Sequence, residues 1–199
     1  IGMRGDKSAK RSGEATKQKI LTAALTRFAR ASYEEVRLRD VAADVGVDVA
    51  LVHRSFGSKE QLFAAVIAAA SPSEFLSAPD HAALCAAFAR RGAAPRQDEC
   101  LQIFVRSLTS PLARDMLRAH CLHDFVEPLT LKLGGPSARQ RATLFVAATI
   151  GVAILRDILE IEPLCDPAEG DARPLIEGLL ASCLGEERPT ADILAAAPE

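Results

Sequence analysis

The sequence contains no tryptophan and one tyrosine, and aromatic residues make up only 5% of its 199 residues. Alanine and leucine dominate instead, which favours helices over sheets, because strands are enriched in aromatic and β-branched residues. No segment shows the alternation of apolar and polar residues that a half-buried strand requires, and no internal repeat is present. We therefore expect an all-α protein.

Recognisable catalytic motifs are also missing. The sequence has no G-x-S-x-G, no glycine loop of the kind that cradles phosphates and no H-E-x-x-H. We expect no enzymatic activity, no catalytic residues, no cofactor and no structural metal. A small helical hydrolase, or a helical bundle that binds haem or a metal, is the rival class. The metal content and absorbance of the purified protein distinguish it.

Long apolar runs are absent too. The longest uncharged run, Ala142–Leu155, has fourteen residues, whereas a bilayer-spanning helix needs about twenty. The run therefore predicts a buried helix and no membrane association, and no signal peptide is recognisable. The cysteines are odd in number and form no C-x-x-C pair, so we expect reduced thiols in a cytoplasmic protein. They are Cys85, Cys100, Cys121, Cys165 and Cys183.

Charge is distributed unevenly along the chain. The net charge is −2, yet residues 1–60 carry +4 and the remainder carries −6. A basic N-terminal segment on an acidic body indicates that the protein binds a polyanion through its N-terminal segment only. The alternative is a solvated basic tail without a partner.

Capping residues, glycines and prolines divide the chain into about nine helices. The predicted helices cover 14–31, 38–45, 49–55, 58–71, 81–90, 98–109, 112–133, 137–160 and a last helix through 175–184. Pro128 should kink the seventh, and capping boxes at Ser58/Gln61 and Ser137/Gln140 should open two others. We expect a DNA-binding domain with a basic arm over 3–60, a ligand-binding and dimerisation domain over 61–186, and a disordered tail over 187–199.

The segment from Arg37 to Phe56 has the pattern of a helix-turn-helix. A two-turn helix ends at Gly46, whose freedom to adopt a positive φ lets two helices meet steeply. A second short helix begins under an Asp48 cap. Its outward residues are free to enter a major groove, which is what this motif requires. A helical hairpin that serves packing alone remains the alternative.

The same stretch resembles the DNA-binding domain of TetR-family regulators, AcrR-like members included. I-L-T-A-A-L-T-R-F-A at Ile20–Ala29 resembles the family's first helix. R-D-V-A-A-D-V-G-V-D at Arg39–Asp48 resembles the second helix and turn, and H-R-S-F-G-S-K-E-Q-L-F at His53–Phe63 the end of the recognition helix and the start of the fourth. The resemblance covers about fifty residues. It implies a three-helix DNA-binding domain, a variable helical bundle, a homodimer and a repressor that a small molecule releases from a pseudo-palindromic operator on double-stranded DNA.

The outward face of the second short helix and the resemblance together predict which side chains meet DNA. They are Arg37, Arg39, Val49, Ala50, His53, Arg54 and Lys59. Lys59 matches the family's phosphate-binding lysine in the first turn of the fourth helix, where the helix dipole also favours an anion. His53 replaces the usual phosphate-binding tyrosine, and Asp48 the commoner serine cap. The arginines could instead be solvated surface charges.

The chain after residue 70 carries apolar stripes with a few inserted polar residues, which predicts a pocket for a mostly apolar ligand. The predicted lining is Phe88, Phe104, Arg106, Leu108, Met116, His120, His123 and Asp124. On an α-helix His120, His123 and Asp124 share one face beside Cys121, a spacing that could hold a metal. The alternative is a hydrogen-bonded polar patch, and no fourth ligand is evident.

The last two long helices predict dimerisation. The Ala142–Leu155 run is apolar on more than one face, so it needs packing partners on several sides. Pairing it and the last helix with their symmetry mates gives a four-helix interface. The predicted interface residues are Phe145, Thr149, Ile150, Val152, Leu179, Leu180 and Cys183. Burial of these helices within one protomer is the alternative.

Overall fold

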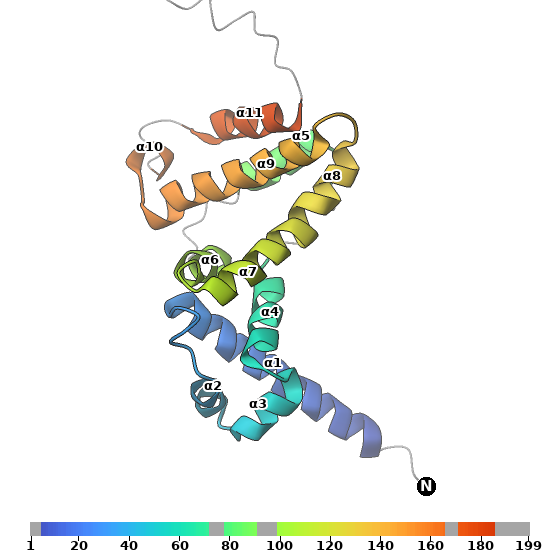
Figure 1. The fold of residues 1–199 in the computed structure, drawn as a ribbon, viewed down its shortest axis with the longest axis vertical. Helices are drawn as coiled ribbons and strands as arrows, with labels where there is room; N and C mark the ends of the chain where they lie inside the picture. Colours follow the sequence, from blue (N-terminus) through green and yellow to red (C-terminus); the bar gives the residue numbers. More distant parts are fainter. Residues whose placement is uncertain (1–4, 72–77, 91–98, 166–170, 186–199) are drawn as a thin grey trace, which may run out of the picture. The chain divides into compact units, whose positions relative to one another are not determined.

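The computed structural model describes residues 5–71, 78–90, 99–165 and 171–185, and every regular element in these ranges is a helix (Figure 1), as predicted. The chain divides into two packing units. The first comprises Ile1–Ser71 and Asp98–His120, and the second comprises Pro72–Gln97 and Cys121–Glu199. The predicted functional boundary at residue 60 stays a prediction, because packing units need not coincide with functional domains.

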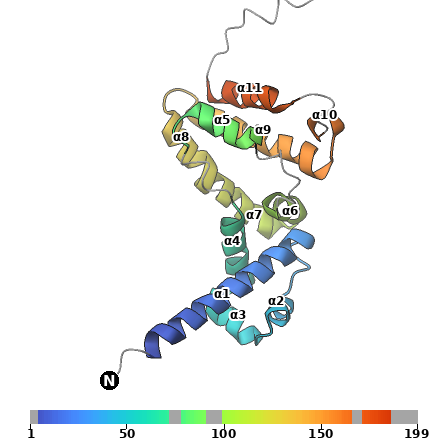
Figure 2. The same ribbon diagram turned by 180° about the vertical axis from the view of Figure 1, so that it is seen from behind.

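Six of the described helices form the first unit. They are α1 (Gly5–Arg30), α2 (Leu38–Val45), α3 (Val49–Phe56), α4 (Lys59–Ala70), α6 (Glu99–Ser107) and α7 (Pro111–His120). Both views show α2 and α3 beside α1 (Figures 1 and 2), and each helix of this group contacts the other two. The start of α1 corrects the prediction, since the helix extends through the expected basic arm to Gly5.

The core of the first unit centres on three aromatic rings. The Phe63 ring lies 4.9 Å from the ring centroids of both Phe28 and Tyr33. Aliphatic side chains from α1 to α4 surround them, and three residues of α6 and α7, Ile103, Ala113 and Leu117, belong to the same buried cluster. The helix-turn-helix therefore shares one core with α6 and α7.

The second unit contains the remaining helices. They are α5 (His81–Arg90), η2 (Cys121–Val126), α8 (Glu127–Leu133), α9 (Ala138–Ala153), η3 (Ile154–Ile158), α10 (Glu162–Cys165) and α11 (Arg173–Leu184). Helix α11 packs against both α5 and α9. The rings of Phe88 and Phe145 meet edge to face with centroids 5.3 Å apart. Leu84, Leu180 and Leu184 are buried around them.

Two local predictions for this unit are wrong, and the helix expected over 112–133 contains a wider turn. Over Cys121–Val126 the chain winds into π-helical turns immediately before Pro128. Proline has no N–H to donate, and its ring meets the carbonyl four residues earlier, so a wider turn accommodates it. Ser137 has a φ of 58° and no side-chain cap bond, so no capping box opens α9. The short helix α10 lies between the helices predicted over 137–160 and 175–184, where the sequence predicted none.

Arg141 joins the ends of two helices. Its Nη1 donates to the carbonyl of Leu184 and its Nη2 to that of Gly134, each over 2.9 Å. These carbonyls lie at the C-termini of α11 and α8, where the helix dipole favours a cation. Gly185 ends α11 in the left-handed conformation.

The structure also bears on the predictions about the cysteines, the membrane and the C-terminal tail. Cys85, Cys100, Cys121 and Cys183 form no disulfide within the part of the chain that the structure describes. No helix in the described ranges has the length and apolar character needed to cross a bilayer. The predicted tail over 187–199 lies outside the described residues.

Candidate nucleic-acid interface

The predicted helix-turn-helix is present in the first unit. Helix α2 ends at Gly46, which has a φ of 72°, and the N–H of Val47 donates to the carbonyl of Ala42 over 3.0 Å. Asp48 then caps α3 by accepting the N–H of Ala50 over 2.7 Å. Val52 of α3 is fully buried and so fixes which side of the helix faces the core.

The opposite side of α3 is exposed. Val49, Ala50, His53 and Arg54 are all exposed, and their spacing along the helix places them on one face. Val49 retains 37% of its accessible surface. The face therefore presents two small apolar side chains, one imidazole and one guanidinium, in the arrangement that the sequence predicted.

His53 and Gly57 form two reciprocal hydrogen bonds. The N–H of Gly57 donates to the carbonyl of His53 over 2.7 Å, and Nδ1 of His53 lies 2.9 Å from the carbonyl of Gly57. Gly57 has a φ of 84°, and a Cβ there would overlap the Gln61 side chain. That side chain completes the predicted capping box with Ser58, which opens α4. The end of α3 is thus held in one conformation.

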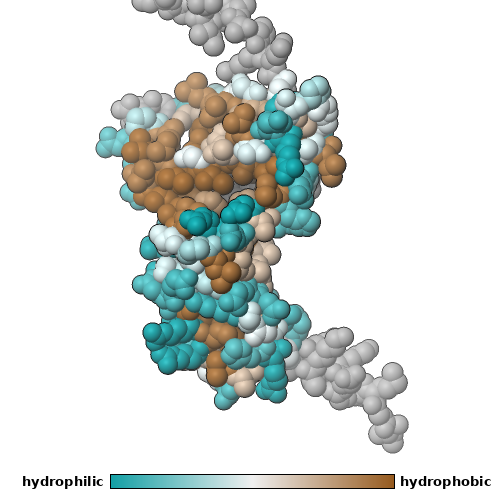
Figure 3. Space-filling model, in the orientation of Figure 1, coloured by the Kyte–Doolittle hydropathy of each residue, from teal (hydrophilic) through white to brown (hydrophobic). Residues whose placement is uncertain are grey.

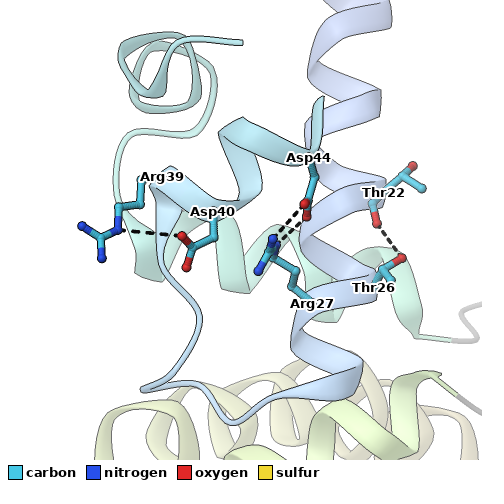
Figure 4. A network of polar contacts seen from close by, with 6 residues as sticks. All are labelled: Thr22, Thr26, Arg27, Arg39, Asp40 and Asp44. Atoms are coloured by element: carbon cyan, nitrogen blue, oxygen red, sulfur yellow. Dashed lines mark hydrogen bonds and ion pairs between the residues drawn. The ribbon is translucent and has the colours of Figure 1, made fainter. Parts of the chain in front are cut away.

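An ion pair fixes α2 on α1 (Figure 4). Two guanidinium nitrogens of Arg27 lie 2.5 and 2.7 Å from the carboxylate oxygens of Asp44. Hydrogen bonding between the two groups raises the pKa of Arg27 and lowers that of Asp44. The side chain of Arg39, on the same helix as Asp44, is 67% exposed, and its Nε lies 3.8 Å from Oδ1 of Asp40. Arg37 is exposed before α2 and provides no cap bond.

Lys59 occupies the first position of α4, as predicted, and its ammonium is partly enclosed. Nζ lies 4.3 Å from the centroid of the Tyr33 ring and 3.4 Å from the backbone carbonyl of Glu34. Burial lowers the pKa of Lys59, although Glu34 and Glu60 act in the opposite direction. In this structure Lys59 therefore holds the loop before α2 against α4, in addition to any role towards DNA.

The predicted pocket residues divide between the two units. Phe104 and Met116 pack against the core of the first unit, where Arg106 and Leu108 are exposed. Phe88 packs on Phe145 in the second unit, where His123 and Asp124 are exposed. A pocket common to all of them stays a prediction.

The polar residues around His120 do not form the predicted helical face. The π-helical turns over Cys121–Val126 change which residues share a face. Nδ1 of His123 lies 3.2 Å from Oε2 of Glu127. Within the described residues, no group of three or more histidine, cysteine or acidic side chains is suited to hold a metal ion.

His120 instead belongs to a cluster that sequence patterns did not reveal. Its Nε2 lies 2.6 Å from Oγ of Ser71, and Cys100 Sγ lies 3.9 Å from the same hydroxyl. Ser71 donates its own proton to the carbonyl of Ile67 over 2.8 Å. The three residues are far apart in the sequence and sit at or beside the points where the chain passes between the two packing units.

The predicted dimer residues differ in exposure. Phe145 and Leu180 are 2% and 1% exposed, so their side chains form the core of the second unit. Thr149, Ile150, Val152 and Cys183 are half-buried, and Leu179 is 49% exposed. Apolar residues nevertheless gather on one face of this unit (Figure 3). The large apolar residues exposed in this unit are Leu131, Leu144, Leu155, Leu159, Ile161, Leu175 and Leu179.

Comparison with solved structures shows the same fold. Two crystal structures of NalD, described as the secondary repressor of the MexAB-OprM multidrug efflux pump in Pseudomonas aeruginosa, both superpose with a TM-score of 0.61. The sequence identities are 18% and 19%. The matches cover 87% and 88% of this chain, and 96% and 97% of NalD. No curated protein sequence matches this chain significantly.

Two family profiles match the sequence. Residues 20–66 match the profile of bacterial regulatory proteins of the TetR family, and residues 81–184 match the Tetracyclin repressor-like C-terminal domain. The first range contains the helix-turn-helix, and the second alone covers more than half of the chain. The chain therefore belongs to the TetR family of DNA-binding transcriptional regulators.

Proposed function

We propose that this protein is a homodimeric repressor that binds a pseudo-palindromic operator and leaves it when a small, mostly apolar effector binds. The observation that carries the proposal is the geometry of α2 and α3, with the core-facing side of α3 fixed by Val52 and its opposite side exposed. Val49 and Ala50 are small enough to let α3 approach the floor of a major groove, and His53 and Arg54 are long enough to reach base edges there. NalD, which has the same fold, is itself described as a repressor.

Selection of bound duplexes from a random library tests the DNA-binding part. We expect two inverted half-sites, because a two-fold dimer reads successive major grooves. The selected duplex then serves in gel shifts across a range of salt concentrations. Failure to enrich any sequence would contradict the proposal.

Lys59 provides a sharper test of the interface. If its ammonium leaves Tyr33 to meet a phosphate, Lys59→Ala should weaken binding evenly across sequences and reduce the salt slope by about one unit. Lys132→Ala, which removes a cation from the second unit, is the matched control and should leave the slope unchanged. An unchanged slope in Lys59→Ala would assign Lys59 to the stability of α4 alone.

The dimer is proposed to form through the exposed apolar face of α9, η3 and α11. Seven large apolar side chains are exposed in the described part of this unit, and all but Leu131 belong to α9, η3, α11 or the turn after η3. That is more than scattered surface residues require. Covering them with a second copy gives the family's four-helix arrangement. Phe145 and Leu180 contribute to this interface only by supporting these helices from the core.

Release by an effector is proposed to act through the end of α4. That helix begins at Lys59 beside the DNA-binding helices and ends at Ser71, which is bonded to His120 of α7. The hydroxyl of Ser71 donates to Ile67, so Nε2 of His120 is the donor in their hydrogen bond. A ligand that accepts a hydrogen bond from Nε2 of His120 would break its bond to Ser71 and so release the C-terminal end of α4 from α7.

The test of this route measures coupling. Apolar compounds are first screened by the shift in melting temperature, and the compounds that bind are titrated into the complex with DNA. Thermodynamic linkage is reciprocal: an effector that lowers the affinity for DNA by some factor must itself bind more weakly to the DNA complex by the same factor. We expect Ser71→Ala to reduce that factor while DNA affinity without effector stays intact. Ser182→Ala, whose hydroxyl bonds only within α11, is the control.

Two alternatives give different results. A constitutive DNA-binding protein would bind the selected duplex with an affinity that no compound changes at saturation. A small ligand-binding protein or enzyme would contain a stoichiometric metal or chromophore and would select no DNA sequence.

A further inference from the structure

The reciprocal bonds between His53 and Gly57 determine which hydrogen-bonding group α3 presents to its surroundings. The carbonyl of Gly57 is an acceptor only, so Nδ1 of His53 must carry the hydrogen in the 2.9 Å contact. In a neutral imidazole only one nitrogen is protonated. Nε2 is therefore left as a bare acceptor.

With Nδ1 turned towards the carbonyl of Gly57, Nε2 is the ring nitrogen left to face the surroundings. His53 is exposed and shares its face of α3 with Val49 and Ala50, one turn earlier. Gly57 cannot easily move away, because its backbone conformation and the adjacent capping box hold it in place. The imidazole thus has a fixed tautomer and a restrained orientation before any DNA arrives.

Phosphate oxygens and the outward nitrogen are both acceptors. A neutral His53 therefore cannot take over the phosphate contact that the resemblance assigns to this position, because that contact requires a donor. The major groove supplies complementary donors at only two places, the N6 amino group of adenine and the N4 amino group of cytosine.

We propose that His53 is a specificity-determining residue that accepts a hydrogen bond from the exocyclic amino group of an adenine or cytosine in each half-site. This inference rests on the proposed function, because it needs α3 to enter the major groove. The restraint by Gly57 makes the contact specific, since the ring has little freedom to offer a donor instead.

Selection from a random library at about pH 8.5, above the range in which imidazoles ordinarily titrate, tests the inference. The unsubstituted protein is compared with His53→Phe, which keeps a ring but has no nitrogen, and with His53→Gln, which keeps an acceptor. Melting temperatures and circular dichroism establish that the variants fold. We expect one position per half-site to require adenine or cytosine in the unsubstituted protein and His53→Gln, and to lose that preference in His53→Phe.

A second measurement removes the amino group from the DNA. The base at that position is replaced by its analogue without the exocyclic amino group. Binding by the unsubstituted protein should weaken about threefold to tenfold, the usual value of one hydrogen bond, and binding by His53→Phe should not change. The two losses form a double-mutant cycle, so their non-additivity identifies the contact directly.

Other results overturn the inference. A uniform loss of affinity for all sequences in His53→Phe, with binding by the unsubstituted protein strengthened on acidification, would show an imidazolium on a phosphate. An unchanged selection in His53→Phe would show that the ring does not read the DNA. If the unsubstituted protein selects no sequence at all, the proposed function falls as well, which distinguishes that failure from the other two.

Discussion

The ammonium of Lys59 lies 4.3 Å from the ring centroid of Tyr33, over the face of the ring. The phenol of the same tyrosine donates to a carboxylate oxygen of Glu60 over 3.3 Å. A cation on the ring face and an anion at the hydroxyl thus join the loop before α2 to the first turn of α4. Tyr33 is 2% exposed, so its ring is shielded from water, whereas Lys59 is half-buried and Glu60 is exposed.

The ionisation of Tyr33 should report this environment. Burial, together with the negative charge of Glu60, raises the pKa of Tyr33 to about 12. The chain has one tyrosine and no tryptophan, so titration of phenolate absorbance reads this group alone. A raised pKa means that the folded state holds the proton more tightly. We therefore expect stability to be lost as pH rises from the ordinary value of 10 towards 12.

Glu60→Gln provides the comparison for that titration. Removing the carboxylate should lower the pKa of Tyr33, while burial, the larger cause, keeps it above its ordinary value. Circular dichroism at each pH confirms that the folded state is being measured. A midpoint near 10 in the folded, unsubstituted protein would contradict the packing described for Tyr33.

The ion pair between Arg27 and Asp44 should stabilise the fold only while Asp44 is ionised. Its pKa is lowered in the folded state from 3.8, chiefly by the hydrogen bond from Arg27. The stabilisation is therefore complete above that value and disappears as pH falls through the lower folded value. Because both side chains are partly exposed, we expect Asp44→Asn to cost less than about 1 kcal/mol at neutral pH.

Denaturant unfolding at a series of pH values measures that difference. The curves of the unsubstituted protein and Asp44→Asn should converge below the ordinary pKa of aspartate. Asp115→Asn, which breaks an exposed pair with Arg118 inside one helix, is the control and should have a smaller effect. A gap of equal size at acidic and neutral pH would mean that Asp44 acts through packing.

Substitution of Gly57 should be costly. Its φ of 84° disfavours any side chain, and a Cβ would displace Gln61 from the capping box of α4. We expect Gly57→Ala to lower the free energy of unfolding by about 1–3 kcal/mol. Gly13→Ala, in α1 with open space around it, is the control. It should be neutral or stabilise by up to about 1 kcal/mol.

Charge on the apolar face of the second unit should separate the dimer. Leu144 and Leu179 are 59% and 49% exposed in the protomer, so Leu144→Glu or Leu179→Glu should leave the protomer folded. In a dimer formed through this face each would bury an unpaired carboxylate. Light scattering should then report half the mass of the unsubstituted protein.

Leu131→Glu is the matched control for that experiment. Leu131 is 85% exposed on α8, outside the proposed interface, and its substitution should leave the mass unchanged. Dissociation by this control as well would move the interface to α8. A monomeric unsubstituted protein would remove the four-helix proposal.

Local signals in the sequence predicted most helix ends. Gly46, Asp48, Ser58 and Gly185 act through backbone bonds a few residues away, so their patterns were sufficient. Ser137 had the same pattern as Ser58 but follows two glycines and a proline. That turn places Ser137 in the left-handed conformation, where its side chain makes no cap bond.

Contacts between distant segments were beyond such patterns. The bond between Ser71 and His120 joins residues 49 positions apart, and that between Ser110 and Glu34 joins residues 76 apart. Sequence patterns also placed Phe145 and Leu180 at an interface, because apolar periodicity identifies a buried face without identifying what covers it. The contact of Lys59 with Tyr33 could not be predicted either, because the family motif specifies the residue type at position 59 and not the side chains that surround it.

The core shared by the first four helices with α6 and α7 has a consequence for engineered regulators. Ile103, Ala113 and Leu117 fill the same cluster as Phe28 and Phe63, and Ser110 is bonded to Glu34 in the loop before α2. A chimera that takes only residues up to Ser71 from this protein would exchange the contacts of these three residues for a foreign surface. Grafts that carry α6 and α7 along with the recognition helix keep the cluster intact, so the natural cut sites lie at 71/72, 97/98 and 120/121.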